Sequence, residues 1–192
     1  WDLYSEKDLP LATNPLPGNN APSFALNDWT AELRNYIGVP AEGALNNAEA
    51  RKMIHGYFAA ISYADAQVGK VLEELDRLGL RQNTIVILWG DHGWHLGDHG
   101  LWGNQTNFEK ATRAPMIISV PGQKAVGKKT DALVELVDIY PTLVELCGLP
   151  MPSGLEGTSF SPLLKDPNRS WKKAAFSQQP REIPGHGDGM GY

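Results

Sequence analysis

"TIVILWGDHG", residues 84–93, is an unbroken apolar run followed at once by glycine, aspartate and histidine. The run is apolar at every position after Thr84 and does not alternate with polar residues, which is typical of a strand covered on both faces. Strands of this kind belong to α/β sheets, in which ligands bind beyond the carboxyl ends of the strands. Asp91 and His92 therefore stand where a binding site is expected.

A long amphipathic helix is predicted before this strand. Asn46 or Asn47 can cap its start, Glu49 lies in its first turn, and Gly79 can take the left-handed conformation at its end. Apolar residues recur every three or four positions and predict one core-facing stripe, made of Met53, Tyr57, Ile61, Ala64, Val68, Val71, Leu75 and Leu78.

The sequence after the strand continues the α/β pattern. "PMIISV" at 115–120 predicts a second buried strand, and "VDIYPTLVELCGLP" predicts a helix that Asp138 caps, with Pro141 in its first turn. "AAFSQQ" at 174–179 is a candidate third strand. The predicted fold class is α/β, with parallel-type central strands flanked by helices. Because a sheet commonly has about five strands, we expect this one to be completed by polypeptide outside the chain.

Composition excludes several classes of function. The formal charge of −5 and the absence of a Lys/Arg cluster argue against nucleic-acid binding. No window approaches the roughly 18 apolar residues of a membrane span. The first residues, "WDLYSEKDLPLATNPLPGNN", do not resemble a signal peptide, and a start at Trp1 indicates a piece of a longer chain or a removed leader. The single Cys147 excludes an internal disulfide and is expected to be a buried, inert thiol.

The loop "GDHGWHLGDHG", residues 90–100, carries the chemistry. A carboxylate beside an imidazole, as in Asp91 and His92, suits a divalent cation, although a loop aspartate can instead cap a turn. Ca²⁺ takes six to eight ligands, so the remaining ligands would come from outside the chain.

The spacing of His95 and His99 also matches the helical zinc motif H-x-x-x-H. Four glycines in this loop disfavour a helix by about 1 kcal/mol each, and no general-base glutamate lies between the histidines. We therefore expect His95, Asp98 and His99 to form hydrogen bonds within the loop and to hold its shape.

The segment "LWGDHGWHLGDHGLWGNQTNFEKATRAPMIISVPG" resembles the second metal-binding segment of the type I sulfatases, in the alkaline phosphatase-like superfamily, and is most similar to the iduronate-2-sulfatase branch. The similarity continues in order through "YFAAISYADAQVGKVLEELDRLGL", "LVELVDIYPTLVELCGLP", "GLEGTSFSPLL" and "FSQQPREIPG". Residues 1–45 are rich in Pro, Asn and Gly, which predicts an irregular, loop-rich segment. The resemblance implies the C-terminal part of the catalytic α/β domain at 46–170 and the start of a C-terminal subdomain at 171–192.

The resemblance also implies a mechanism. In such sulfatases a formylglycine, made from Cys or Ser in a C-x-P-S-R type motif, forms a hydrate that attacks the sulfate sulfur while Ca²⁺ holds the nucleophile and the sulfate. Asp91 and His92 match the late metal-ligand pair. Neither "CGLPM" at Cys147 nor "SQQPR" at Ser177 has the motif's spacing. The formylglycine and the other metal ligands are therefore expected in the remainder of the parent chain.

The substrate-contact positions include one departure from the family. Where "LWGKQTNFE" is usual, this chain has "LWGNQTNFE", so that Asn104 replaces the lysine that contacts the sulfate or the leaving oxygen. This replacement has three alternative interpretations: the protein contacts its substrate differently, Lys110 or Arg113 supplies the missing positive charge, or the protein's activity is impaired. Trp94 and, more weakly, Gln105 are candidate sugar contacts, with loop packing as the alternative for Trp94. Arg181 is a further candidate, with an ordinary surface arginine as its alternative.

The leading hypothesis is a sulfuric ester hydrolase that removes sulfate from sulfated sugars of the glycosaminoglycan type. The alternatives are a phosphatase or phosphodiesterase of the same superfamily, and an inactive chain that acts as a binding or structural module. Family analogy favours a periplasmic, secreted or lysosome-like location, but the sequence carries no address that decides it.

Overall fold

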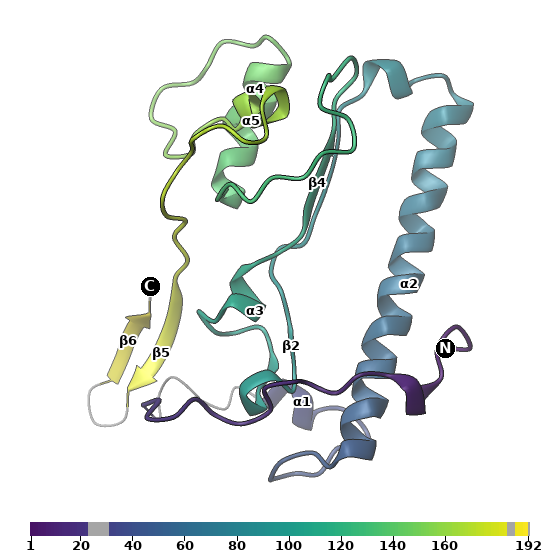
Figure 1. Ribbon diagram of the computed structural model, residues 1–192, viewed down its shortest axis with the longest axis vertical. Coiled ribbons are helices and arrows are strands. Elements are labelled where there is room, and N and C mark those ends of the chain that lie inside the picture. Colours follow the sequence, from purple (N-terminus) through teal and green to yellow (C-terminus); the bar gives the residue numbers. More distant parts are fainter. Residues whose placement is uncertain (23–30, 184–186, 192) are drawn as a thin grey trace. The chain divides into compact units, whose positions relative to one another are not determined.

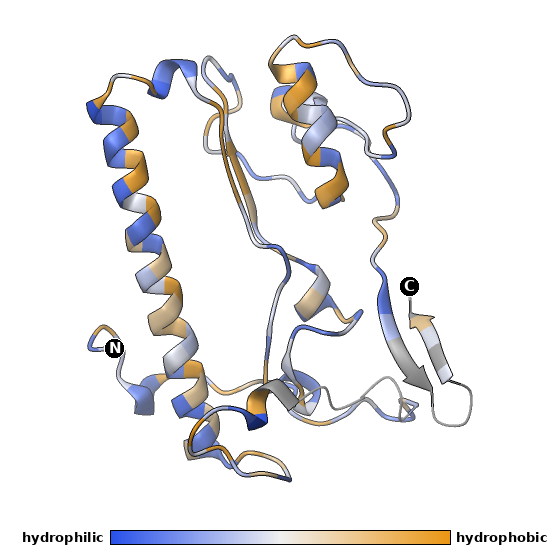
Figure 2. Cartoon of the chain, turned by 180° about the vertical axis from the view of Figure 1, so that it is seen from behind, coloured by the Kyte–Doolittle hydropathy of each residue, from blue (hydrophilic) through white to orange (hydrophobic). Residues whose placement is uncertain are grey.

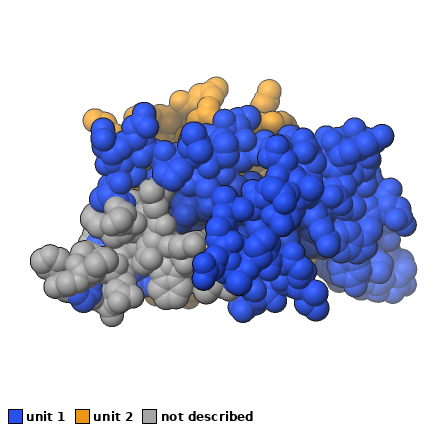
Figure 3. All heavy atoms as spheres, turned by 90° about the horizontal axis from the view of Figure 1, so that it is seen from below, with its two compact units in different colours: residues 1–80, 92–115, 178–192 blue, residues 81–91, 116–177 orange. Residues whose placement is uncertain are grey.

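The computed structural model describes residues 1–22, 31–183 and 187–191 (Figure 1). The chain forms two compact units, coloured separately in Figure 3. Unit 1 comprises 1–80, 92–115 and 178–192, and unit 2 comprises 81–91 and 116–177.

Unit 1 is built on the long helix α2 (Asn47–Arg77), which begins and ends as the sequence predicts. The Asn46 side chain accepts hydrogen bonds from two backbone N–H groups of the first turn, and the Glu49 carboxylate accepts one from the Asn46 N–H, which completes a capping box. Gly79 follows the helix with a φ of 68°.

The apolar stripe of α2 is covered less than predicted. Figure 2 shows hydrophobic residues recurring along the helix among hydrophilic ones. Only Ala50 and Ile54 are buried, whereas Ile61 and Val71 are 52% and 69% exposed. The prediction that the whole stripe faces the core of this chain is therefore wrong, because the described residues cover only its first turns.

The rest of unit 1 consists of short helices and strands joined by loops. They are η1 (Glu6–Asp8), α1 (Ala31–Arg34), β2 (His95–Leu96), η4 (Asp98–Gly100), β3 (Trp102–Gly103), α3 (Glu109–Thr112), β5 (Gln179–Ile183) and β6 (Gly187–Gly191). β2 pairs with β3, and β5 pairs with β6, both antiparallel. The hairpin β5–β6 is not predicted by the sequence, and the strand expected at 174–179 instead begins at Gln179. Buried apolar residues of this unit include Leu9, Leu33, Leu101 and Ala111.

Unit 2 contains both strands that the apolar runs predict. Its elements are η3 (Arg81–Asn83), β1 (Val86–Trp89), β4 (Met116–Ser119), η5 (Leu136–Asp138), α4 (Ile139–Leu146) and α5 (Ser161–Lys165). Val144, Phe160 and Leu163 form its buried apolar centre, where α4 contacts α5.

The pairing of β1 with β4 corrects one predicted feature. The strands are antiparallel, with Val86 opposite Ser119 and Trp89 opposite Met116, whereas the sequence predicts parallel-type strands. The connection between them holds the β2–β3 hairpin and the four-residue helix α3, and not the longer crossover helix that parallel neighbours usually need. An unbroken apolar run predicts that both faces of a strand are apolar, but it does not predict whether the strand is parallel or antiparallel to its neighbour.

The faces of this two-stranded sheet are apolar but only partly covered (Figure 2). Trp89 is 47% exposed and Ile117 is 64% exposed. The described residues therefore do not supply the cover on both faces that the sequence predicts for β1.

Cys147 also differs from expectation. It is the C-cap residue of α4 and is exposed, because the buried face of this short helix is formed by Pro141, Thr142 and Val144. None of the described helices is long and apolar enough to cross a membrane.

Candidate metal and substrate site

The candidate metal ligands lie directly beyond the carboxyl end of β1. Asp91 and His92 are both exposed. His92 Nδ1 lies 2.8 Å from the carbonyl oxygen of Gly93, and because a carbonyl can only accept, Nδ1 carries the proton. In the neutral imidazole, Nε2 therefore has the lone pair that a metal ligand needs.

The backbone after His92 is held by close packing. The Gly93 N–H donates to the Ala111 carbonyl oxygen at 2.7 Å. A Cβ at position 93 would lie 2.0 Å from the Lys110 carbonyl oxygen, so only glycine allows this approach. Gly93 is therefore held against the backbone of α3 by a hydrogen bond and by close contact.

Trp94 is half-buried and lies near two other rings. Its ring centroid lies 6.1 Å from that of Tyr57 on α2 and 6.0 Å from that of His92. Burial raises the pKa of Tyr57, so its phenol remains neutral near pH 7. Loop packing therefore occurs at Trp94, and its partial exposure leaves a sugar contact open.

The short hairpin β2–β3 brings two candidate positions to one end. His95 is opposite Gly103, so Trp94 and Asn104 are the residues that flank this pair on its open side. Asn104 and Gln105 are both half-buried. The Asn104 carbonyl oxygen accepts a hydrogen bond from the Thr106 N–H at 2.8 Å, which begins a tight turn.

His95 is completely buried at the base of this hairpin. Its Nε2 lies 2.8 Å from Thr106 Oγ1, while Nδ1 has no hydrogen-bond partner among the described residues. Burial lowers the pKa of His95, an effect that the nearby Asp98 carboxylate opposes only in part. The ring is therefore neutral at pH 7.

His99 has partners of its own within unit 1. Its N–H donates to the Asn14 carbonyl oxygen at 2.6 Å, and its Nδ1 accepts from Asn14 Nδ2 at 3.2 Å. Its backbone is left-handed, with a φ of 57°, and its ring stacks on Phe108 with centroids 5.0 Å apart. The histidines are bonded, but to Thr106 and Asn14, which lie outside residues 90–100, so the prediction that they bond within the loop is wrong. Within the loop, His99 Nε2 lies 3.7 Å from the Asp98 carboxylate.

The positive side chains near Asn104 do not form a buried site. Lys110 is exposed. Arg113 is also exposed, and its guanidinium lies 3.3 Å from the Glu109 carboxylate in an ion pair between residues four apart on the helix. The side chain of Arg181 lies outside the described part of the structure.

The donor set of the described residues is small. Among them, no group of three or more His, Cys, Asp or Glu side chains is arranged to hold a metal ion. A carboxylate at Asp91 and an imidazole at His92 are nevertheless side chains of the types that bind divalent cations.

Sequence reasoning missed three residues that organise the loop. Thr106 bonds His95, Phe108 contacts both histidine rings, and Asn14 anchors His99 from the N-terminal segment. The first two follow a two-residue strand, which is too short to leave a periodic pattern. Asn14 is 85 positions from His99, and no local signal connects them.

Unit 2 has a buried polar cluster of a different kind. Asp138 is completely buried and accepts from the N–H groups of Glu135 and Thr158, at 2.9 and 2.7 Å. Lys172 Nζ lies within 2.9 Å of both Asp138 oxygens and 2.7 Å from Glu135 Oε2. Asp138 occupies the predicted N-cap position of α4, but its side chain forms none of the cap hydrogen bonds. That part of the prediction is wrong.

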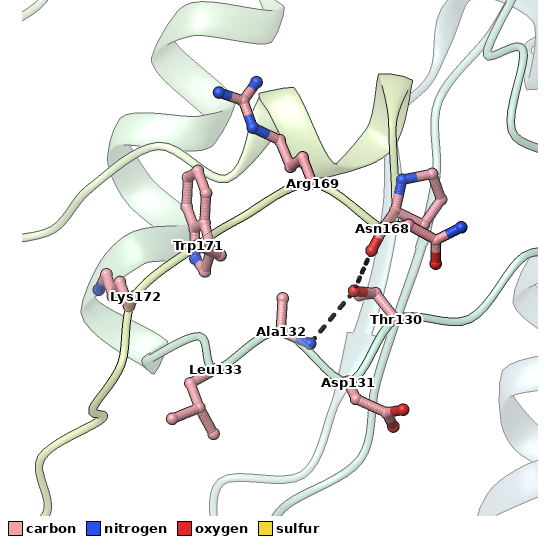
Figure 4. A pocket seen from close by; sticks show the side chains of 9 residues that line it. Thr130, Asp131, Ala132, Leu133, Asn168, Arg169, Trp171 and Lys172 are labelled. Atoms are coloured by element: carbon pink, nitrogen blue, oxygen red, sulfur yellow. Dashed lines mark hydrogen bonds between the residues drawn. The ribbon is translucent and has the colours of Figure 1, made fainter.

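Beside this cluster lies an open hollow of about 290 Å³ (Figure 4). Its lining comes from two segments, 130–133 and 167–172. Thr130 Oγ1 donates to the Pro167 carbonyl oxygen at 2.6 Å and joins the two segments. The Arg169 guanidinium lies 5.9 Å from the centre of the Trp171 ring.

Solved structures define the class of fold. The chain superposes on a phosphonate monoester hydrolase from Silicibacter pomeroyi with a TM-score of 0.77 and 27% identity, covering 96% of this chain and 37% of that one. It also matches a protein solved in complex with its substrate D-glucosamine-2-N,6-O-disulfate, with a TM-score of 0.65 and 29% identity over 69% of this chain and 28% of that one. The predicted fold class, part of an alkaline phosphatase-like α/β fold, is confirmed.

Sequence comparison narrows the class to one family. The family model described as Sulfatase matches residues 10–149. Iduronate 2-sulfatase of Mus musculus is 37% identical over 180 residues, which cover 78% of this chain and 32% of that protein. The chain belongs to the sulfatase family, and it spans about a third of the length of these relatives.

Proposed function

We propose that the protein containing this chain hydrolyses sulfate esters on sulfated sugars, in the manner of an iduronate-2-sulfatase. Membership of the sulfatase family and the similarity to iduronate 2-sulfatase support the reaction. The similar protein solved with a disulfated glucosamine supports a sugar substrate.

The observation that carries this proposal is the Asp91–His92 pair beyond β1. The carboxylate of Asp91 and Nε2 of His92 would bind Ca²⁺, with His92 oriented by its hydrogen bond to the Gly93 carbonyl. When bound, the cation would supply positive charge to the sulfate oxygens without moving a proton. The other ligands and a formylglycine nucleophile would come from polypeptide outside this chain.

The open end of the β2–β3 hairpin would contact the substrate. Trp94 offers a ring face to the apolar C–H groups of a sugar, and Gln105 offers an amide to its hydroxyl groups. Asn104 would donate a neutral hydrogen bond to the sulfate or to the leaving oxygen, where the family usually has a charged lysine.

Sulfate release from a panel of substrates tests the reaction, with the protein at its natural length. We expect release from a sulfated disaccharide and from an aryl sulfate. Asp91→Asn should reduce kcat/KM at least 100-fold, because one metal ligand loses its charge. Asp65→Asn, the same change at an exposed aspartate of α2, should stay within threefold. Equal losses in the two variants would contradict the role of Asp91.

Phosphonate or phosphate ester hydrolysis is the second candidate. It is favoured by the TM-score of 0.77 with the phosphonate monoester hydrolase. Aryl phosphonate and aryl phosphate therefore belong in the same panel. A kcat/KM for either that exceeds the value for the aryl sulfate would replace the first proposal with this one.

Asn104 raises a third candidate, an inactive binding module. If position 104 is the family's lysine position, Asn104→Lys should raise kcat/KM of the natural-length protein by about 100-fold, the usual size of one charge-assisted contact in a transition state. No rise would show that the position has another role, and no activity in either protein would favour the binding module.

A further inference from the structure

The turn at residues 104–108 depends on one hydroxyl group. Thr106 Oγ1 accepts a hydrogen bond from the Phe108 N–H at 3.3 Å, while the Thr106 N–H donates to the Asn104 carbonyl oxygen at 2.8 Å. A hydroxyl has one proton and two lone pairs, so Thr106 can accept from Phe108 and still bond other groups. Nε2 of His95 is one of these groups, at 2.8 Å.

The surroundings of His95 leave its ring little freedom to move. The side chain is fully buried, and its ring meets Phe108 edge-on, with centroids 6.0 Å apart and an interplanar angle of 89°. His99 stacks on the same Phe108 and is itself bonded to Asn14. The turn is therefore held at Thr106 by one histidine and at Phe108 by two.

The same histidine also fixes the other side of the candidate subsite. His95 directly follows Trp94 and pairs with Gly103 across the hairpin, and Gly103 directly precedes Asn104. A shift of His95 would therefore move Trp94 and the 104–108 turn relative to each other.

We propose that His95 is a positioning residue: through Thr106 it fixes the turn that presents Asn104 and Gln105 to a sulfated sugar, opposite Trp94. This inference rests on the proposed function. It assigns the recognition of the sugar, as distinct from the sulfate group, to the geometry that His95 and Thr106 maintain.

Thr106→Val tests the proposal, because valine keeps the shape of threonine and removes the hydroxyl. Misplacing a substrate contact by about 1 Å can cost a factor near 100. We expect KM for a sulfated disaccharide to rise at least 10-fold and KM for a small aryl sulfate to change less than threefold. Thr106→Ser, which restores the hydroxyl, should return KM to within threefold of the original value.

Thr142→Val is the matched control. Like Thr106, Thr142 is buried and its hydroxyl accepts a phenylalanine N–H, from Phe160 at 2.9 Å, but it lies in unit 2. A purely structural effect lowers kcat for both substrates by one factor, through loss of folded protein, and leaves KM unchanged. Thr142→Val should behave in this way and Thr106→Val should not.

Hydrogen exchange at the Phe108 amide separates this inference from the proposed function. Thr106→Val should speed that exchange at least 10-fold, and Thr106→Ser should not. If the unmodified protein releases no sulfate, the proposed function fails, and the exchange rate alone decides whether Thr106 holds the turn. In an active protein, unchanged KM for the disaccharide or unchanged exchange in Thr106→Val would overturn the inference.

Discussion

Among the described residues, each unit completely buries one titratable side chain, and the two side chains are bonded differently. In unit 2 both carboxylate oxygens of Asp138 are bonded, to two backbone N–H groups and to Lys172. In unit 1 only one ring nitrogen of His95 has a partner among the described residues. An unsatisfied buried group costs stability, and such groups are concentrated where function requires them. The Asp138 cluster stabilises unit 2, whereas His95 lies beside the candidate substrate contacts, directly after Trp94 and opposite Gly103, which precedes Asn104.

Removing the central group of unit 2 should have the largest effect. Asp138→Ala leaves Lys172 with Glu135 alone and removes the acceptor of two backbone N–H groups, so we expect a loss of about 3–5 kcal/mol in the free energy of unfolding. Denaturant unfolding followed by tryptophan fluorescence measures it. Asp131→Ala, at an exposed aspartate of the same unit, should change stability by less than about 0.5 kcal/mol. Similar losses in both variants would show that the buried cluster is not special.

A pair of glycines sharpens the comparison further. A Cβ at Gly157 would lie 2.1 Å from the Val137 carbonyl oxygen, much as one at Gly93 would meet Lys110. Gly93→Ala and Gly157→Ala should each destabilise by about 3 kcal/mol, at the upper end of overpacking effects. Gly69→Ala on α2, where a Cβ meets nothing within 4 Å, should be neutral or slightly stabilising. Only Gly93→Ala should lower sulfate release per folded molecule; an equal effect of Gly157→Ala would remove the functional distinction.

How far the sequence predicts this molecule depends on the range of the interactions. Helix α2 is correct at both ends because Asn46, Glu49 and Gly79 act within a turn of the residues that they cap. The predicted direction of β4 relative to β1 is wrong, because that direction depends on the path of the long connection between the two strands. The candidate metal pair could be predicted, because Asp91 and His92 are adjacent in the sequence and both are residue types that bind metals.

The supports of the two buried groups are not visible in the same way. His95 and Thr106 are 11 positions apart, and Asp138 and Lys172 are 34 apart. No local pattern predicts contacts over such separations. The sequence therefore points to His95 and Asp138 as structural residues, but it cannot identify Thr106 and Lys172 as their partners.

The regions around His95 in unit 1 and around Asp138, Glu135 and Lys172 in unit 2 should also be destabilised in different pH ranges. Burial lowers the pKa of His95 from 6.5, with Asp98, His99 and Lys110 as the charged neighbours. The folded state then binds fewer protons than the unfolded state, so stability near His95 falls as pH drops below 6.5. The hydrogen bond from Lys172 lowers the pKa of Glu135 from 4.5, so the stability that this ion pair contributes to unit 2 is lost on the acid side as the pH falls below 4.5.

The alkaline side completes this prediction. Burial alone would lower the pKa of Lys172, but its hydrogen bonds to Asp138 and Glu135 raise the pKa above 10.5, so this contribution is lost only at still higher pH. The Phe176 N–H donates to Glu135 Oε1 at 3.0 Å. Amide exchange at Phe108, for the His95 loop, and at Phe176, for the unit 2 cluster, therefore measures the protection of each region once it is corrected for intrinsic rates. Loss of protection at both amides in one pH range would contradict the difference between the clusters.

The smallest effect is expected at Cys147, which lies outside both clusters. Because the thiol is exposed at the end of α4, Cys147→Ser should change stability by less than about 0.5 kcal/mol and leave sulfate release unchanged. The native thiol should react with a thiol reagent as fast as it does in the unfolded chain. Slow labelling would restore the prediction of a buried thiol.

The central claim is that Asp91 and His92 bind a divalent cation on which sulfate release depends. Sulfate release by the natural-length protein, measured before chelation, after chelation and after the return of Ca²⁺, tests it most directly. We predict at least a 100-fold loss on chelation, full recovery with Ca²⁺ in the unmodified protein, and no recovery in His92→Ala at the same Ca²⁺ concentration. Undiminished release after complete removal of metal would contradict the claim.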